Sequence, residues 1–135
     1  MPITFEYAGD PVPQPRPRVS TAGGYGRAYV PQKHPVHAYR AGIAAAAKRA
    51  GVQPVNGPVG VVIDLVFARP KSHLTKSGVK ATAPRLPRCD VDNAAKAVLD
   101  ALTGVAWNDD SQVARLVVEK TYSTEGRTTV RICDG

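Results

Sequence analysis

The sequence predicts a single α/β (α+β) domain, residues 1 to 135, in which one mixed β-sheet packs against two helices. One short segment alternates apolar and polar residues and three others are apolar or β-branched runs, as in strands, whereas apolar residues recur every three or four positions in two further segments, as in amphipathic helices. The order along the chain is strand, helix, strand, helix, strand, strand, which is typical of a sheet-and-helix domain. A chain of 135 residues with 43% hydrophobic residues can form one such core without disulfides or structural metal.

The first half of the chain predicts two strands and one helix. Residues 3 to 7 alternate as a short strand. Residues 36 to 50 follow Pro35, a favourable first helical residue, and end at Gly51, which suits a helix terminus. Residues 59 to 67 are almost continuously apolar, which predicts a largely buried central strand.

The second half predicts one helix and a β-hairpin. A helix is expected between Asp92 and Gly104, because the apolar residues there recur with helical spacing. Two β-branched runs, residues 113 to 122 and 128 to 133, flank a Ser-Thr-Glu-Gly turn. This pattern is typical of two strands paired as a hairpin.

The charge of the chain predicts a polyanionic partner. The formal net charge is +7, and residues 1 to 89 hold 13 Lys and Arg against three Asp and Glu, whereas residues 90 to 135 hold five against eight. A positive field of this kind concentrates DNA or RNA near the protein. A merely soluble basic protein is the alternative that charge alone leaves open.

Two segments, 10 to 35 and 69 to 89, are expected to be basic loops, because Pro and Gly or a lack of periodicity disfavour regular structure there. After Asp10 neither segment contains an acidic residue. They are interpreted as arms that contact the phosphates of a nucleic acid, with a solvated linker and plain disorder, respectively, as the alternatives. The candidate DNA-binding residues are Arg16, Arg18, Arg27, Lys33, Arg69, Lys71, Lys76, Lys80, Arg85 and Arg88.

Membrane and secreted classes are not expected. The N-terminus lacks the pattern of a signal peptide, and no run of about 18 apolar residues occurs. Cys89 and Cys133 show neither metal-ligand nor disulfide-framework spacing. We therefore expect a cytoplasmic protein.

The acidic residues gather around the predicted second helix. Asp90 and Asp92 are two apart, so their carboxylates project to one side where the chain is extended. Lys96 lies one helical turn beyond Asp92 and shares its face. The helix is roughly 16 Å long, and the loop after it can reach back about as far, so Asp109 or Asp110 could join the first pair.

These residue types predict a metal-dependent phosphoryl-transfer site. Clustered carboxylates repel one another unless a cation lies among them, and oxygen ligands favour Mg²⁺, with Mn²⁺ as a substitute. The metal would activate water, and Lys96 would add positive charge near the scissile phosphate. Simpler roles stay open, namely a helix N-cap for Asp92 or Asn93 and a turn for Asp109 and Asp110.

The motif D-V-D-N-x-x-K-A-V-L-D-A-L-x-G, followed by W-N-D-D-S-Q-V, resembles the RusA family of Holliday junction resolvases, which is common in phages and prophages. The match is specific over residues 90 to 120. It is looser over residues 2 to 70, which include the opening G-D-P-V-P-Q-P-R-P-R. The basic stretch from Lys71 to Arg88 is longer than in compact members of the family.

The resemblance implies a homodimeric, Mg²⁺-dependent endonuclease that nicks two opposed strands of a four-way DNA junction in recombination or repair. It also implies that Asp90, Asp92 and Asp110 bind metal, that Lys96 is catalytic and that Asp109 is a less central acid. The residues by themselves indicate only a metal-dependent enzyme that acts on nucleic acid. A general nuclease for flaps or other branched DNA and a non-catalytic architectural DNA-binding protein remain the alternatives.

Overall fold

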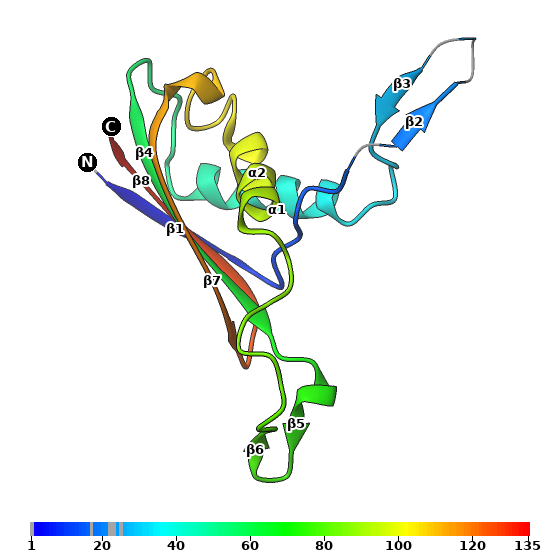
Figure 1. The fold of residues 1–135 in the computed structure, drawn as a ribbon. Helices are drawn as coiled ribbons and strands as arrows, with labels where there is room; N and C mark the ends of the chain where they lie inside the picture. Colours follow the sequence, from blue (N-terminus) through cyan, green and yellow to red (C-terminus); the bar gives the residue numbers. More distant parts are fainter. Residues whose placement is uncertain (1, 17, 22–23, 25) are drawn as a thin grey trace.

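One mixed sheet forms the centre of the fold (Figure 1), and its strands lie in the order β1 (Ile3–Ala8), β8 (Arg127–Asp134), β4 (Val59–Ala68) and β7 (Val113–Ser123). β8 is antiparallel to both of its neighbours, whereas β4 and β7 are parallel. Helices α1 (Val36–Arg49) and α2 (Val91–Leu102) lie on the same side of this sheet (Figure 1). The predicted mixed sheet, its two helices and their order along the chain are therefore confirmed.

This computed structural model describes residues 2–16, 18–21, 24 and 26–135 of the chain. For residues 18–20 and 27 it describes the backbone only. Among the described residues, no helix combines the length and the apolar character needed to cross a membrane.

The core lies between the helices and the sheet. α1 buries an apolar stripe that includes Val36, Tyr39 and Ile43, each at most 1% exposed. Its C-cap is Ala50, and the next residue is Gly51, whose φ of +87° suits glycine. α2 buries small residues and larger apolar ones on one face, which lets it lie close to α1. The buried residues of α2 are Ala94, Ala95, Ala97, Val98, Ala101 and Leu102.

Strand β7 turns alternate side chains toward the helices. Its register pairs Val118 with Ile63 of β4, which is fully buried in the core, and side chains of paired residues share a face of the sheet. By the same alternation Leu116, Lys120 and Tyr122 lie on this face. One edge strand therefore contributes two apolar residues, a lysine and a tyrosine to the helix side of the sheet.

The prediction that the last two strands pair as a hairpin is wrong, because β4 lies between β7 and β8. Ile63 of β4 pairs with Val118 on one side and with Val130 on the other. The short connection after Ser123 crosses the end of β4 and spans two strand spacings, about 9–10 Å. A chain of four residues covers this distance, so a short turn does not prove that its two strands pair.

Both basic segments contain short two-stranded sheets, which the expectation of loops did not include. In the first segment β2 (Arg18–Ser20) pairs with β3 (Arg27–Tyr29). In the second, a 3₁₀ turn, η1 (Lys71–His73), precedes the paired strands β5 (Leu74–Thr75) and β6 (Gly78–Val79). Strands of two or three residues are too short for their alternation to be seen in the sequence. We call residues 69–89 the β5–β6 arm.

Candidate active site

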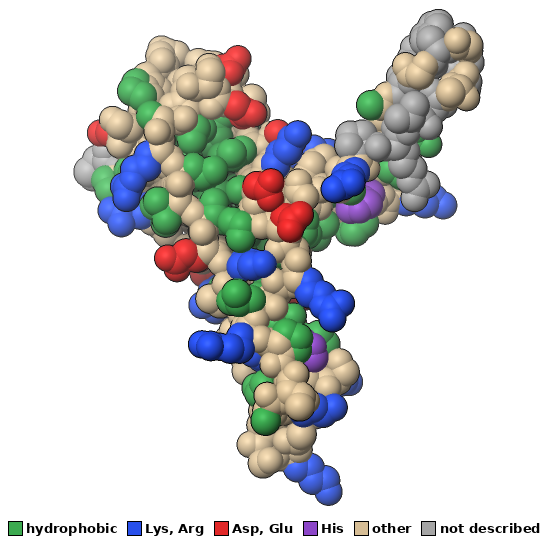
Figure 2. All heavy atoms as spheres, viewed as in Figure 1, with side chains coloured by type: hydrophobic (Ala, Val, Ile, Leu, Met, Phe, Trp, Pro, Cys, Tyr) green, Lys and Arg blue, Asp and Glu red, His purple; other side chains and the backbone are tan. Residues whose placement is uncertain are grey.

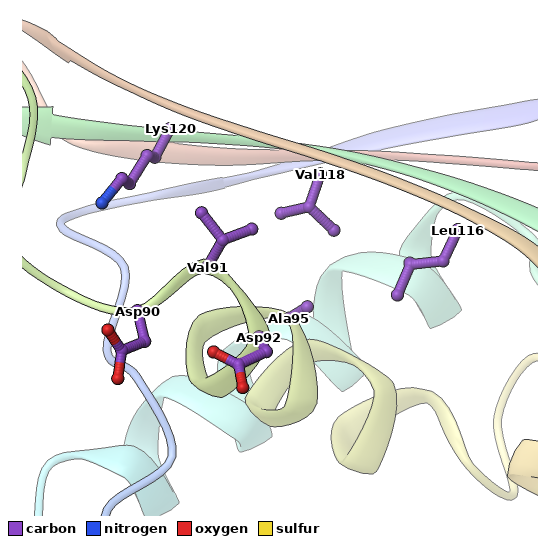
Figure 3. A pocket seen from close by; sticks show the side chains of 7 residues that line it. All are labelled: Asp90, Val91, Asp92, Ala95, Leu116, Val118 and Lys120. Atoms are coloured by element: carbon purple, nitrogen blue, oxygen red, sulfur yellow. The ribbon is translucent and has the colours of Figure 1, made fainter.

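Asp90 and Asp92 lie at the mouth of a groove between the start of α2 and strand β7 (Figure 3). The groove has a volume of about 540 Å³. Its floor is apolar and its polar groups gather at one end, as in many ligand-binding clefts. The lining residues are Asp90, Val91, Asp92 and Ala95 from the helix side and Leu116, Val118 and Lys120 from β7.

The start of α2 presents the two carboxylates together. Asp90 is the N-cap residue with an extended backbone (φ −71°, ψ 131°), so the alternative of Asp92 or Asn93 as N-cap is wrong. Among the described residues, the Asp90 side chain makes no capping hydrogen bond. Both carboxylates are exposed, and Figure 3 shows them directed to the same side while Val91 points toward the sheet. The helix N-terminus favours negative charge at both positions.

Lys120 fixes the chain immediately before Asp90. Its ammonium group donates hydrogen bonds to the carbonyl oxygens of Pro87 and Cys89, both at 2.8 Å. Burial raises the pKa of the Cys89 thiol, and the nearby ammonium of Lys120 acts in the opposite direction. Sequence reasoning gave Lys120 no role, although a lysine in the inward-facing alternation of β7 was an available signal.

Lys96 is exposed on α2, one turn beyond Asp92, as the spacing predicts. It is not among the residues that line the groove. The first basic segment also reaches this part of the helix, because the backbone N–H of Gln14 donates to the carbonyl of Asn93 at 2.9 Å. The first basic segment is thereby tied to the start of α2.

Asp110 lies at the opposite end of α2, not beside Asp90 and Asp92. Its carboxylate accepts hydrogen bonds from the hydroxyl of Thr103 (2.5 Å), the C-cap residue of α2, and from the indole N–H of Trp107 (3.4 Å). The 12-residue helix separates the two ends by about 18 Å. Trp107 is fully buried and holds the loop after α2 at that far end.

Asp109 has a turn role in the structure. It is the N-cap of the 3₁₀ turn η2 (Asp110–Gln112), and its carboxylate accepts from the backbone N–H of Ser111 at 2.8 Å. This hydrogen bond lowers the pKa of the Asp109 carboxyl. The Gln112 side chain completes the capping box by accepting from the backbone N–H of Asp109 at 3.0 Å. The turn interpretation is therefore confirmed for Asp109.

The donor set at the start of α2 fits a hard divalent cation with a partial protein shell. Mg²⁺ commonly takes one or two carboxylates and completes its octahedron with water and phosphate oxygens. Asp90 and Asp92 offer two exposed carboxylates. Over the described ranges, no group of three or more His, Cys, Asp or Glu side chains gathers closely enough to hold a metal. One chain therefore does not assemble the three-carboxylate site that the sequence suggested.

The candidate DNA-binding residues lie on the two basic segments, and Figure 2 shows Lys and Arg side chains along the β5–β6 arm. Arg69 is half-buried at the base of this arm. The side chains of Arg18 and Arg27 lie outside the described part of the structure. The side chains that are exposed to solvent are Arg16, Lys33, Lys71, Lys76, Lys80, Arg85 and Arg88.

Comparison with known proteins identifies the family of the chain. The chain is 34% identical over 135 residues to YqaN, an uncharacterized protein of Bacillus subtilis strain 168, and the alignment covers 96% of this chain and 94% of its relative. A family model described as "Endodeoxyribonuclease RusA" matches residues 8–133, which include the carboxylates, Lys96 and both basic segments. The chain belongs to the RusA endodeoxyribonuclease family.

Proposed function

We propose that the protein is a Mg²⁺-dependent endonuclease that resolves four-way DNA junctions by paired nicks in recombination or repair. The observation that carries this proposal is the pair of exposed carboxylates, Asp90 and Asp92, at the start of α2 in an otherwise basic protein. Carboxylates weaken the binding of phosphate unless a cation bridges them. A purely architectural DNA-binding surface gains nothing from this pair, whereas a metal-dependent nuclease needs it.

Asp90 and Asp92 would hold the metal, which, when bound, lowers the pKa of a water molecule and offsets charge on the phosphate. The helix keeps Asp92 in place, and the hydrogen bonds of Lys120 fix the chain before Asp90. Lys96 would place a positive charge near the scissile phosphate, because it projects from the same face as Asp92.

A homodimer would bring Asp110 into this chemistry. Within one chain Asp110 lies a helix length away from Asp90 and Asp92. If two copies of α2 were to lie antiparallel about a twofold axis, each Asp110 would lie beside the Asp90 and Asp92 of the other copy. Two equivalent sites related by such an axis also match the two opposed nicks of a symmetric junction.

The test is the Mg²⁺-dependent cleavage of a labelled four-way junction, with linear duplex and a flap as competing substrates. Paired nicks on the junction, with little cutting of duplex, are the expected result. Cutting of every branched substrate at similar rates would support a general nuclease for branched DNA. Tight junction binding with no cleavage at any Mg²⁺ or Mn²⁺ concentration would contradict the proposal and favour an architectural protein.

A further inference from the structure

A second cavity lies at the base of the β5–β6 arm, beyond the groove that holds the carboxylates. Its volume is about 330 Å³, at the lower end of the usual range for small-ligand sites, roughly 300–1,000 Å³. Leu74 and Val79, from the two strands of the arm, are 44% and 53% exposed. The lining residues are Arg69, Leu74, Val79, Tyr122, Ser123 and Thr124.

An aromatic ring and a guanidinium group are held together in this cavity. The guanidinium carbon of Arg69 lies 4.4 Å from the centre of the Tyr122 ring, and His73 meets the same ring edge-on at 5.5 Å. Arg69 also donates to the carbonyl of Pro84 at 2.7 Å, so the arm folds back onto its own base. Its backbone N–H donates to the carbonyl of Ser123. The orientation of the ring is thus fixed before any ligand arrives.

The cavity is close to the proposed catalytic groups. Tyr122 and Lys120 are alternate residues on the same face of β7, so their α-carbons lie about 6.6 Å apart. Lys120 in turn binds the carbonyl of Cys89, the residue before Asp90. The cavity therefore lies one step along the same face of β7 from the lysine that holds the chain before Asp90.

We propose that this cavity binds one unstacked nucleobase of the DNA substrate, next to the phosphate that is cleaved. The proposal rests on the proposed function, because it assumes a DNA substrate. A base offers a flat π-face for Tyr122, an apolar edge for Leu74 and Val79, and polar edge atoms for the Ser123 and Thr124 hydroxyls. Branched DNA supplies such bases, since unstacking is easiest where the duplex is interrupted.

The charge around the cavity favours a nucleotide over a peptide or a second protein copy. The β5–β6 arm carries six Lys and Arg residues and no acidic residue between Arg69 and Cys89. Lys71, Lys76 and Lys80 are exposed on the same arm as the apolar wall of the cavity. This combination of an aromatic surface with a positively charged track is how proteins bind single-stranded nucleic acid.

The test is a scan of single abasic sites through the nucleotides that flank the nick, with affinity measured in the absence of divalent metal. For the wild type we expect one abasic position to weaken binding by roughly 5- to 150-fold, the range for loss of one base stacked on an aromatic side chain. Tyr122→Leu should show the same loss on intact DNA and no further loss at that position. Tyr122→Phe, which keeps the ring, should behave as the wild type.

A second variant keeps the proposal testable if Tyr122→Leu does not fold. Leu74→Ser removes part of the exposed wall and leaves the ring in place, so it should also reduce the sensitivity to the abasic position. If no abasic site changes the affinity of the wild type, while the wild type still cleaves the junction, the proposal that the cavity binds a base is wrong and the proposed function is unaffected. A change of oligomeric state in Tyr122→Leu without DNA would overturn the base-binding proposal in favour of a second protein copy. If the wild-type protein neither binds nor cleaves DNA, both the base-binding cavity and the proposed function are wrong.

Discussion

Lys120 donates a hydrogen bond to the carbonyl of Cys89, 31 residues away in sequence, and so ties β7 to the residue that precedes Asp90. A second bond, to the carbonyl of Pro87, holds the end of the β5–β6 arm at the same point. The position of the first carboxylate therefore depends on a side chain of an edge strand. Lys120 is therefore expected to act as a positioning residue for Asp90, the proposed metal-binding carboxylate.

Replacing Lys120 should lower the cleavage rate far more than DNA affinity. Lys120→Met leaves two carbonyl groups without their donor, and a shift of Asp90 by about 1 Å is enough to lower kcat by about 10²-fold. The free energy of unfolding should fall by about 1–3 kcal/mol. Single-turnover rates, dissociation constants and thermal melts would be compared with Lys48→Met, an exposed lysine on α1. An unchanged kcat in a folded Lys120→Met protein would rule out the positioning role.

Asp90→Asn and Asp92→Asn should each reduce Mg²⁺-dependent cleavage by at least roughly 10²- to 10³-fold, the usual range for loss of one stabilising group in an active site. Affinity for the junction without metal should be kept or become tighter, because a negative charge facing phosphate is removed. Glu119→Gln, an exposed acid on the other face of β7, is the matched control. Joint loss of binding and cleavage would indicate that the carboxylates are structural.

Lys96→Ala should slow cleavage by about 10²-fold with a change in affinity of only a few-fold. One phosphate contact among many contributes little to binding, whereas a placed charge stabilises the transition state. Lys96→Arg should restore activity only in part, since the guanidinium is larger and stays protonated. Full activity of Lys96→Ala in single-turnover assays would remove this residue from the mechanism.

Mixed dimers test whether Asp110 acts in the partner copy. Consider a dimer of one Asp90→Asn chain and one Asp110→Asn chain. If each site combines Asp90 of one copy with Asp110 of the other, one site is fully wild-type and the other carries both changes. Such mixed dimers, purified through two different tags, should nick one strand of the junction, although the homodimer of either variant is expected to be inactive. No nicking by the mixed dimer would show that the two residues do not act across an interface.

The stability of the turn after α2 should depend on pH through Asp109. Its carboxyl has a lowered pKa in the folded protein because Ser111 donates to it, so the folded state gains stability above the unfolded pKa of about 3.9. This gain is lost as the pH falls through the lower, folded pKa. The wild type should melt above Asp109→Ala at pH 7, and this difference should shrink below about pH 4. A difference that persists unchanged at pH 2 would contradict the capping role.

The order of the six main elements and the pairing of Asp90 with Asp92 could be predicted from the sequence because both are local. Periodicity reports which face of a segment is buried, and two residues at the start of a helix are close in any fold. Strand order is different, since nothing in the turn after Ser123 indicates that β4 lies between β7 and β8. Pairing of that kind is decided by contacts between distant segments.

The position of Asp110 could not be predicted from the sequence, because the length of a loop limits how far it extends but does not determine the direction in which it runs. Burial of Trp107 sets that direction here, as it keeps the loop at the far end of α2. The alternation of β7 marks Lys120 as inward-facing, but its role could not be predicted, because its partners are backbone carbonyl groups of a distant segment and no residue type identifies them.

The position of β8 between β1 and β4 has a consequence for synthesis. Ile3 pairs with Ile132, and in the described structure the other residues of β1 also pair with β8, so β1 is synthesised long before the strand with which it pairs. Contacts between such distant residues form slowly. The basic segments of a nascent chain are therefore synthesised before its sheet is complete. The sheet is complete only after β8 has been synthesised, and a truncation that removes β8 should leave an unfolded, protease-sensitive product rather than a weakened enzyme.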